Sequence, residues 1–156
     1  MNPLRRAFLK NAGAVGSFAI AIAAGLLKPA AVFAAAWNSL AFTAKETADA
    51  INNAGYGGAT ESRDIVLKVP DIAENGAVVP VSAISNIPGT TSMAIFVEKN
   101  PTPMIANFEF SNGAEAYIAT RVKMAKTSIV RVTVKAGGKN YTNGREVKVT
   151  IGGCGG

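Results

Sequence analysis

The feature that most constrains the fold is a two-residue alternation of apolar and polar side chains that begins near Asp64 and continues to Ile151. Such alternation is typical of β-strands with one buried face. Turn sequences interrupt it about every eight to twelve residues, which predicts seven or eight short strands in an all-β antiparallel sandwich. The expected strands are residues 64–69, 77–84, 92–99, 104–110, 115–124, 128–135, 140–142 and 145–151.

Turn and proline positions refine this prediction. Asn75-Gly76 is an expected turn, and Pro80 within the second run predicts an edge strand or a bulge because proline cannot donate to a ladder. We expect residues 115–124 to pair with 128–135. Asn143-Gly144 predicts a two-residue hairpin that would lead into the last strand.

A helix is expected before the strands, from Trp37 to about Asn53. Asn38 or Ser39 can cap its start, and Gly55 would end it. Its apolar stripe follows helical spacing and predicts packing against a sheet more than it indicates a partner-binding face. The stripe consists of Trp37, Leu40, Ala41, Ala44, Ala48 and Ile51.

Residues 1–36 have the composition of a targeting segment rather than part of the fold. Residues 4–10, Leu-Arg-Arg-Ala-Phe-Leu-Lys, resemble a twin-arginine signature, and the apolar run from Ala12 to Leu27 is shorter than the ~20 residues of a membrane span. Cleavage is expected after Ala34 or Ala36, and an uncleaved membrane anchor is the alternative. The expected destination is the periplasm, reached by the twin-arginine route.

Composition excludes several classes of function. Without the four basic residues of the leader, the formal net charge falls from +6 to +2, so the basis for nucleic-acid binding is lost. The sequence has no histidine and a single cysteine, which excludes a Cys/His metal cluster, a histidine base and an internal disulfide. We expect no metal site, no cofactor and no catalytic residue.

The last five residues hold that single cysteine. Glycine has the largest conformational freedom, so a flexible tail is expected to follow the 37–151 domain. No histidine, lysine or arginine flanks the thiol in sequence, so nothing beside it favours the reactive thiolate. This pattern predicts a covalent carrier rather than a catalyst: Cys154 would hold the cargo, tethered by Gly152, Gly153, Gly155 and Gly156.

Other charged residues offer weaker candidates. Asp71 and Glu74 fall in an expected loop, where solvated carboxylates are much more common than an acid/base pair. A series of basic residues along two expected strands indicates a solvated sheet face, or else a surface for an acidic partner or anionic cargo. These residues are Arg121, Lys123, Lys126, Arg131 and Lys135.

Several segments together resemble the SoxY family, the carrier subunit of the bacterial thiosulfate-oxidising system. They are the Gly-Gly-Cys-Gly-Gly end, the twin-arginine leader, the helix that begins at Trp37, and residues 70–81 and 97–101. The resemblance implies an immunoglobulin-like sandwich that forms a heterodimer with a small β-protein, SoxZ. It also implies that Cys154 carries sulfur intermediates between a haem enzyme, a hydrolase and a molybdenum-haem dehydrogenase.

Two other functions stay open. An exported structural sandwich could use Cys154 only for an intermolecular disulfide, and a disulfide-linked homodimer is compatible with either role. Ubiquitin-like sulfur carriers also end in Gly-Gly, but they use an adenylated carboxylate, which requires ATP, and their fold has few strands around a helix.

Overall fold

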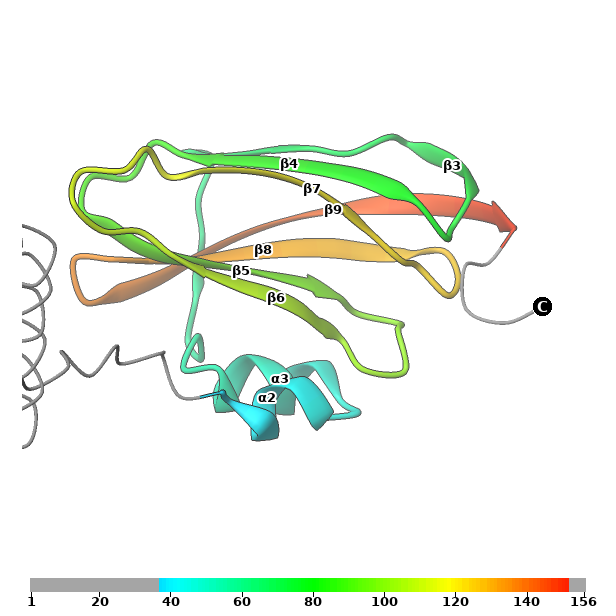
Figure 1. Ribbon diagram of the computed structural model, residues 1–156, viewed down its shortest axis with the longest axis horizontal. Helices are drawn as coiled ribbons and strands as arrows, with labels where there is room; N and C mark the ends of the chain where they lie inside the picture. The colour runs from blue at the N-terminus through cyan, green and yellow to red at the C-terminus, as the bar shows by residue number, and fades with distance from the viewer. Residues whose placement is uncertain (1–36, 152–156) are drawn as a thin grey trace, which may run out of the picture. The chain divides into compact units, whose positions relative to one another are not determined.

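Two β-sheets packed face to face make up most of the computed structural model, which describes residues 37–151 (Figure 1). The larger sheet has the strand order β1-β9-β8-β5-β6, with β3 beside β9, and the smaller has the order β2-β4-β7. The strands are β1 (Thr60–Glu61), β2 (Ile65–Lys68), β3 (Ile72–Asn75), β4 (Val79–Ser85), β5 (Thr90–Val97), β6 (Met104–Glu109), β7 (Tyr117–Val122), β8 (Ser128–Ala136) and β9 (Lys139–Ile151).

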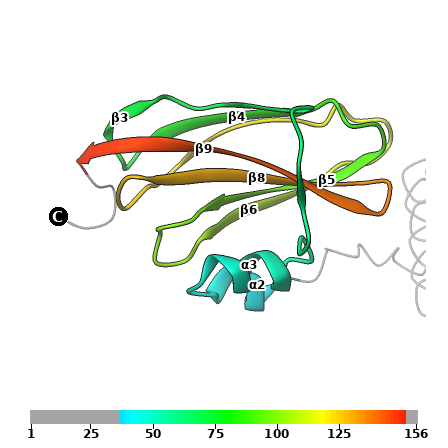
Figure 2. The same cartoon turned by 180° about the vertical axis from the view of Figure 1, so that it is seen from behind.

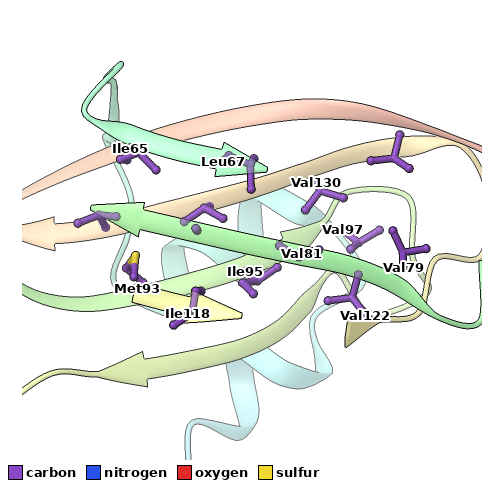
Figure 3. Packing of buried hydrophobic residues seen from close by; sticks show 14 of the residues in the cluster. Ile65, Leu67, Val79, Val81, Met93, Ile95, Val97, Ile118, Val122 and Val130 are labelled. Atoms are coloured by element: carbon purple, nitrogen blue, oxygen red, sulfur yellow. The ribbon is translucent and has the colours of Figure 1, made fainter. Parts of the chain in front are cut away.

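The main core lies between the sheets, where the predicted alternation turns every second side chain inward. Val130, Val132 and Val134 of β8 are fully buried and belong to the same core as Ile65 of β2 and Val81 of β4. Figure 3 shows Val130, Ile65 and Val81 in this core. Each fully buried side chain of this kind contributes roughly 1.5–3 kcal/mol relative to its exposed state. The expected all-β sandwich is therefore confirmed, and the burial pattern of β2 and β8 explains why the alternation was visible.

A second core lies on the other face of the large sheet, under two helices, α2 (Ser39–Thr43) and α3 (Thr47–Asn53) (Figure 2). It forms because β5 is buried on both faces: Ala94 and Phe96 point toward Ala41 and Ala50, away from the sandwich interior. Residues 37–151 thus form three layers, and α2 and α3 both pack on the larger sheet.

The single helix expected from Trp37 to Asn53 is wrong in detail, since the chain breaks it into α2 and α3. Asn38 caps α2 as expected, because its Oδ1 accepts from Ala41 N at 3.1 Å, and Gly55 ends α3 with a φ of +76°. Trp37 and Leu40 are exposed rather than buried in the stripe. Neither described helix is long and apolar enough to cross a membrane.

Tyr56 fixes the helical layer to the sheet. Its hydroxyl lies 2.6 Å from Asn107 Oδ1 and 2.9 Å from Ser92 Oγ, and its ring packs edge-on against Phe96. The ammonium of Lys135 lies 4.3 Å from the ring centroid and donates to the carbonyl of Ala54. Because the Tyr56 hydroxyl has two polar partners, this side chain is buried at low cost.

The predicted hairpin at Asn143-Gly144 does not exist. β9 runs unbroken from Lys139 to Ile151, and the turn before it is made by Gly137 and Gly138, whose φ values are +56° and +74°. Asn143 instead donates from Nδ2 to the carbonyl of Ile65, 2.7 Å away on the other sheet. Its amide serves a contact between the sheets, so the local Asn-Gly signal was misleading.

Other strand predictions also need correction. The expected loop at residues 71–75 contains β3, which pairs in parallel with β9, as does the short β1, so the sandwich is not wholly antiparallel. β7 pairs with β4 and not with β8. β4 is the central strand of its sheet despite Pro80. The proline is tolerated because β2 pairs only from Ser82 onward, which leaves Pro80 with a neighbour on one side only.

Burial raises the pKa of Tyr56 to about 12; the hydrogen bond with Ser92 opposes this rise and the nearby charge of Glu109 adds to it. An unfolded tyrosine titrates near 10, so above that pH the unfolded state holds fewer protons than the folded one, and stability falls as pH rises. We expect the wild-type protein to lose about 2 kcal/mol more than Tyr56→Phe between pH 8 and about pH 11.5.

Denaturant unfolding at a series of pH values measures this difference. Between pH 6 and 8 the two proteins should differ by a constant amount, which serves as the internal control. Parallel curves above pH 10 would contradict the burial of this hydroxyl.

Candidate functional site

The predicted carrier residues lie outside the described part of the chain; they are Cys154, Gly152, Gly153, Gly155 and Gly156. What the structure describes is the strand that leads to them. β9 is the longest strand of the fold, and it reaches Ile151, the residue before Gly152 (Figure 1). The site therefore has to be built from the way in which the end of β9 is held.

One side of that end is held by β3. The two strands pair in parallel, with Ile72 opposite Lys148 and Asn75 opposite Ile151. Gly76 N donates to the carbonyl of Ile151 at 2.7 Å, which is the last backbone bond before the glycines. The Thr150 hydroxyl adds a bond of 2.8 Å to the carbonyl of Glu74. The ladder thus continues to the final described residue.

The other side of β9 is held first by β8 and then by a side chain. The β8 ladder stops at Ser128 opposite Val147. Beyond it, the backbone N–H of Val149 donates to Thr127 Oγ1 at 3.0 Å. Thr127 therefore takes over where the strand pairing ends, and β9 has hydrogen-bond partners on both sides nearly to Ile151.

A buried asparagine braces the loop that carries Thr127. Asn100 donates from Nδ2 to the carbonyl of Lys123 at 2.7 Å, and its Oδ1 accepts from Ala125 N at 2.9 Å. In the same loop Met124 is fully buried, and its N–H donates to the carbonyl of Gly76. The loops on both sides of the β9 end are thus joined to each other and to the core.

Positive charge dominates the segments that border this end. Lys123, Lys126 and Lys148 are exposed, and so are the carboxylates Glu74 and Glu146, neither of which is in an ion pair among the described residues. Asp71 is paired with Arg145 at 3.0 Å, an exposed pair of little energetic value. The border of the β9 end is therefore suited to an anion or to an acidic surface.

The fold separates the predicted series of basic residues. Arg121 lies on the small sheet, and Lys123 and Lys126 lie in the loop after it. Arg131 points toward the helical layer and binds Glu98 with an N–O distance of 2.6 Å, while Lys135 covers the Tyr56 ring. The series is not one face, because β7 and β8 belong to different sheets.

Asp71 directly precedes β3 and pairs with Arg145, and Glu74 lies within β3, so the two carboxylates are not both in a loop as the sequence predicted. Among residues 37–151 no group of three or more Asp, Glu, Cys or His side chains could hold a metal. Sequence reasoning missed Thr127, Asn100 and the whole of β3. Their roles depend on partners more than 20 residues away, and no local motif marks them.

The chain is similar to one protein family and to several solved structures. The family model described as sulfur oxidation protein SoxY matches residues 52–154. A solved structure of the sulfur carrier protein SoxY from Chlorobium limicola f thiosulfatophilum is 45% identical, with a TM-score of 0.59, over 66% of this chain and 96% of that one. Superoxide reductase (neelaredoxin) from Ignicoccus hospitalis is 15% identical over 56% of this chain and 80% of that one, with a TM-score of 0.49. No curated protein matches.

Replacing Thr127 by valine keeps the side-chain shape and removes the acceptor for the Val149 N–H. A net hydrogen bond contributes about 1 kcal/mol, so the Val149 amide should exchange with solvent about fivefold faster in Thr127→Val. Native-state hydrogen exchange by NMR measures this rate, with Val147, held by the β8 ladder, as the internal reference.

Thr91→Val is the matched control, since it removes an exposed hydroxyl that donates to Lys135 on the far part of the sheet. Equal exchange at Val149 in all three proteins would show that Thr127 does not hold the end of β9.

Proposed function

Because the chain belongs to the SoxY family of sulfur oxidation proteins, we propose that this sulfur carrier holds its cargo covalently on Cys154. The family membership itself supports a carrier role in sulfur oxidation. The proposal adds the atom that carries the cargo. The observation that supports it is that the fold holds β9 up to Ile151, three residues before the sole sulfhydryl in the sequence.

The loading step we propose joins Cys154 to thiosulfate. The thiolate sulfur and the sulfane sulfur of thiosulfate form an S–S bond, the thiol loses its proton, and two electrons pass to a haem enzyme. Hydrolysis then breaks the bond between the sulfane sulfur and the sulfonate, which releases sulfate and leaves a persulfide on Cys154. A dehydrogenase can oxidise that remaining sulfur.

Physical reasoning supports a division of labour between the folded domain and the glycine segment. Ladder bonds on both sides of β9 hold its end, so a docked domain presents the segment from a fixed point. Three residues from Ile151 span about 10 Å, and glycines have no side chain that would block a narrow channel. Tethering also keeps a bound intermediate at high effective concentration through successive reactions.

The chemistry of the thiol agrees with a passive carrier. The sequence has no histidine, and no basic residue flanks Cys154, so its own neighbours do not favour the thiolate. An enzyme that used this cysteine as its nucleophile would need such activation built in. We propose that each receiving enzyme supplies it, while Lys123, Lys126 and Lys148 favour an anionic adduct near the end of β9.

We further propose the setting that the family resemblance implies. The chain would act in the periplasm after twin-arginine export, as a heterodimer with a SoxZ-like small β-protein. It would dock transiently with haem, hydrolase and dehydrogenase enzymes. The exposed basic border of the β9 end is compatible with acidic rims around the openings of those active sites.

Substituting Cys154 by serine tests the carrier role directly. We expect thiosulfate-dependent turnover in the reconstituted pathway to be abolished, with the fold unchanged, because serine cannot form the S–S bond. Mass spectrometry of the C-terminal peptide should show a wild-type adduct that a reducing thiol removes. Turnover retained in Cys154→Ser, with only disulfide dimerisation lost, would favour a structural role instead.

Gly153→Val tests whether the absence of side chains matters. A branched residue beside Cys154 should leave unfolding unchanged and slow adduct formation by about tenfold or more, since small misplacements of reacting atoms are costly. Gly153→Ala is the matched control and should have a smaller effect. Adduct formation is followed by intact mass, and equal rates for all three proteins would rule out threading through a narrow channel.

A further inference from the structure

Asparagine precedes glycine at three places in the sequence, Asn75-Gly76, Asn112-Gly113 and Asn143-Gly144. This dipeptide is chemically labile. The backbone nitrogen of the following residue can attack the side-chain amide carbon of asparagine, and glycine, which has no side chain, shields that nitrogen least. The reaction requires an accessible pair and a backbone that can rotate to bring the two atoms together. The three pairs differ in both respects, so the fold determines which of them can react.

Asn75-Gly76 is restrained at the end of β9. Gly76 is buried, and its nitrogen, the atom that would attack, donates its hydrogen to the carbonyl of Ile151 at 2.7 Å. Asn75 Oδ1 accepts from Ala77 N at 2.8 Å, which holds the side chain that would be attacked. Both reacting groups are therefore hydrogen-bonded, and the pair is protected as long as β9 stays paired with β3.

Asn143-Gly144 is protected because both residues lie inside β9, where they pair with Val132 and Arg131 of β8. Asn143 Nδ2 also donates to the carbonyl of Ile65 at 2.7 Å. A rotation of the backbone between Asn143 and Gly144 would break the β8–β9 ladder. The reaction at this pair therefore requires an opening of the larger sheet, which costs a large part of the stability of the domain.

Asn112-Gly113 is far less restrained. The pair lies in the connection between β6 and β7, where residues 111–115 are all exposed. Among residues 37–151, neither the Asn112 side chain nor the Gly113 N–H has a hydrogen-bond partner. One backbone hydrogen bond of 3.0 Å, from Ala114 N to the carbonyl of Ser111, closes the turn. A net hydrogen bond contributes about 1 kcal/mol, so this turn opens at low cost.

The backbone conformation of the pair adds to this difference. Asn112 has a φ of +55° and is the one residue other than glycine, within the described range 37–151, in the left-handed region. Asparagine visits this region more readily than most residues, but it still favours a negative φ. Apart from its chain neighbours, no atom of residues 37–151 lies within 4 Å of the position that a Cβ on Gly113 would occupy. No other segment of the described chain therefore packs on the turn to keep it closed.

We propose that Asn112 is a site of spontaneous deamidation, and that the fold restricts this reaction to Asn112 among the three asparagine–glycine pairs. The Gly113 nitrogen forms a bond with Cγ of Asn112, and its proton passes to the departing amide nitrogen, which leaves as ammonia when the Cγ–Nδ2 bond breaks. Water then adds to either carbonyl carbon of the cyclic imide and opens the ring. The product is aspartate, or isoaspartate, in which the peptide bond runs through the side chain.

The modification places a new negative charge at a defined end of the sandwich. Phe110, which leads into the turn, donates from its N–H to the carbonyl of Thr91 at 2.8 Å. The Thr91 hydroxyl in turn donates to the carbonyl of Lys135, close to the turn that begins β9. The new carboxylate would lie in the same exposed segment as Glu115, at the opposite end of β9 from Ile151 (Figure 1). The proposed carrier function and this modification are therefore independent, and either can fail without the other.

Peptide mapping by mass spectrometry measures conversion at each pair while the full chain, folded, is incubated in mildly alkaline buffer. We expect Asn112 to convert at least about tenfold faster than Asn75 or Asn143, since a factor of ten needs only about 1.4 kcal/mol of difference in opening free energy. In urea the protection is lost, and all three pairs should convert at similar rates. The same ratio of rates in urea as in the folded protein would show that sequence alone selects Asn112 and would overturn the proposal.

Asn112→Gln is the matched control, because its side chain keeps the amide but is one carbon longer and closes the ring much more slowly. Conversion at this position should stop, while the rates at Asn75 and Asn143 stay unchanged. Folded wild-type protein in which Asn75 or Asn143 converts as fast as Asn112 would contradict the proposal. So would folded protein in which all three pairs stay intact over a time in which the urea-treated chain is converted.

Discussion

Hydrogen bonding along both sides of β9 is the constraint on which the rest of the described fold depends. On one side β8 pairs with the strand from Lys139 to Val147. On the other side β1 pairs near Tyr141 and β3 pairs near Ile151, and between them the Asn143 amide bonds to the other sheet. Since an unpaired edge exposes donors and acceptors to other chains, the two short parallel strands shield the parts of this edge of the 13-residue strand that they pair with.

The strands β5 and β8 pack on both of their faces, and this packing stabilises the sheet to which β9 is paired. Val130, Val132 and Val134 fill the sandwich, while Phe96 supports the helical layer from the opposite face. Tyr56 joins these layers because its ring is apolar and its hydroxyl finds two polar partners. The helices α2 and α3 therefore stabilise the larger sheet from the face opposite the sandwich core.

The sequence predicted the strands whose side chains alternate between buried and exposed. It did not predict the features that depend on hydrogen-bond partners far away in the sequence. The alternation in β2 and β8 is a property of neighbouring residues, so the strands and the sandwich could be predicted. Asn143-Gly144 looked like a turn because the 2.7 Å bond from Asn143 to Ile65 crosses between sheets and leaves no local trace. Likewise Thr127 and β3 could not be assigned to the end of β9, and Cys154, the residue that sequence marked most clearly, lies beyond the described chain.

The hydrogen bond from Gly76 N to the Ile151 carbonyl fixes the point from which the length of the C-terminal segment can be counted. Counted from it, chain geometry allows the α-carbon of residue 154 to travel about 10 Å. If Cys154 holds the cargo as proposed, this length, together with the cysteine side chain and its adduct, sets how far below the docking surface a reaction centre can lie. Adding or deleting one glycine would change the maximum distance between Ile151 and the cysteine by about 3.3 Å. A change of this size would discriminate between enzymes whose active sites lie at different depths below their surfaces.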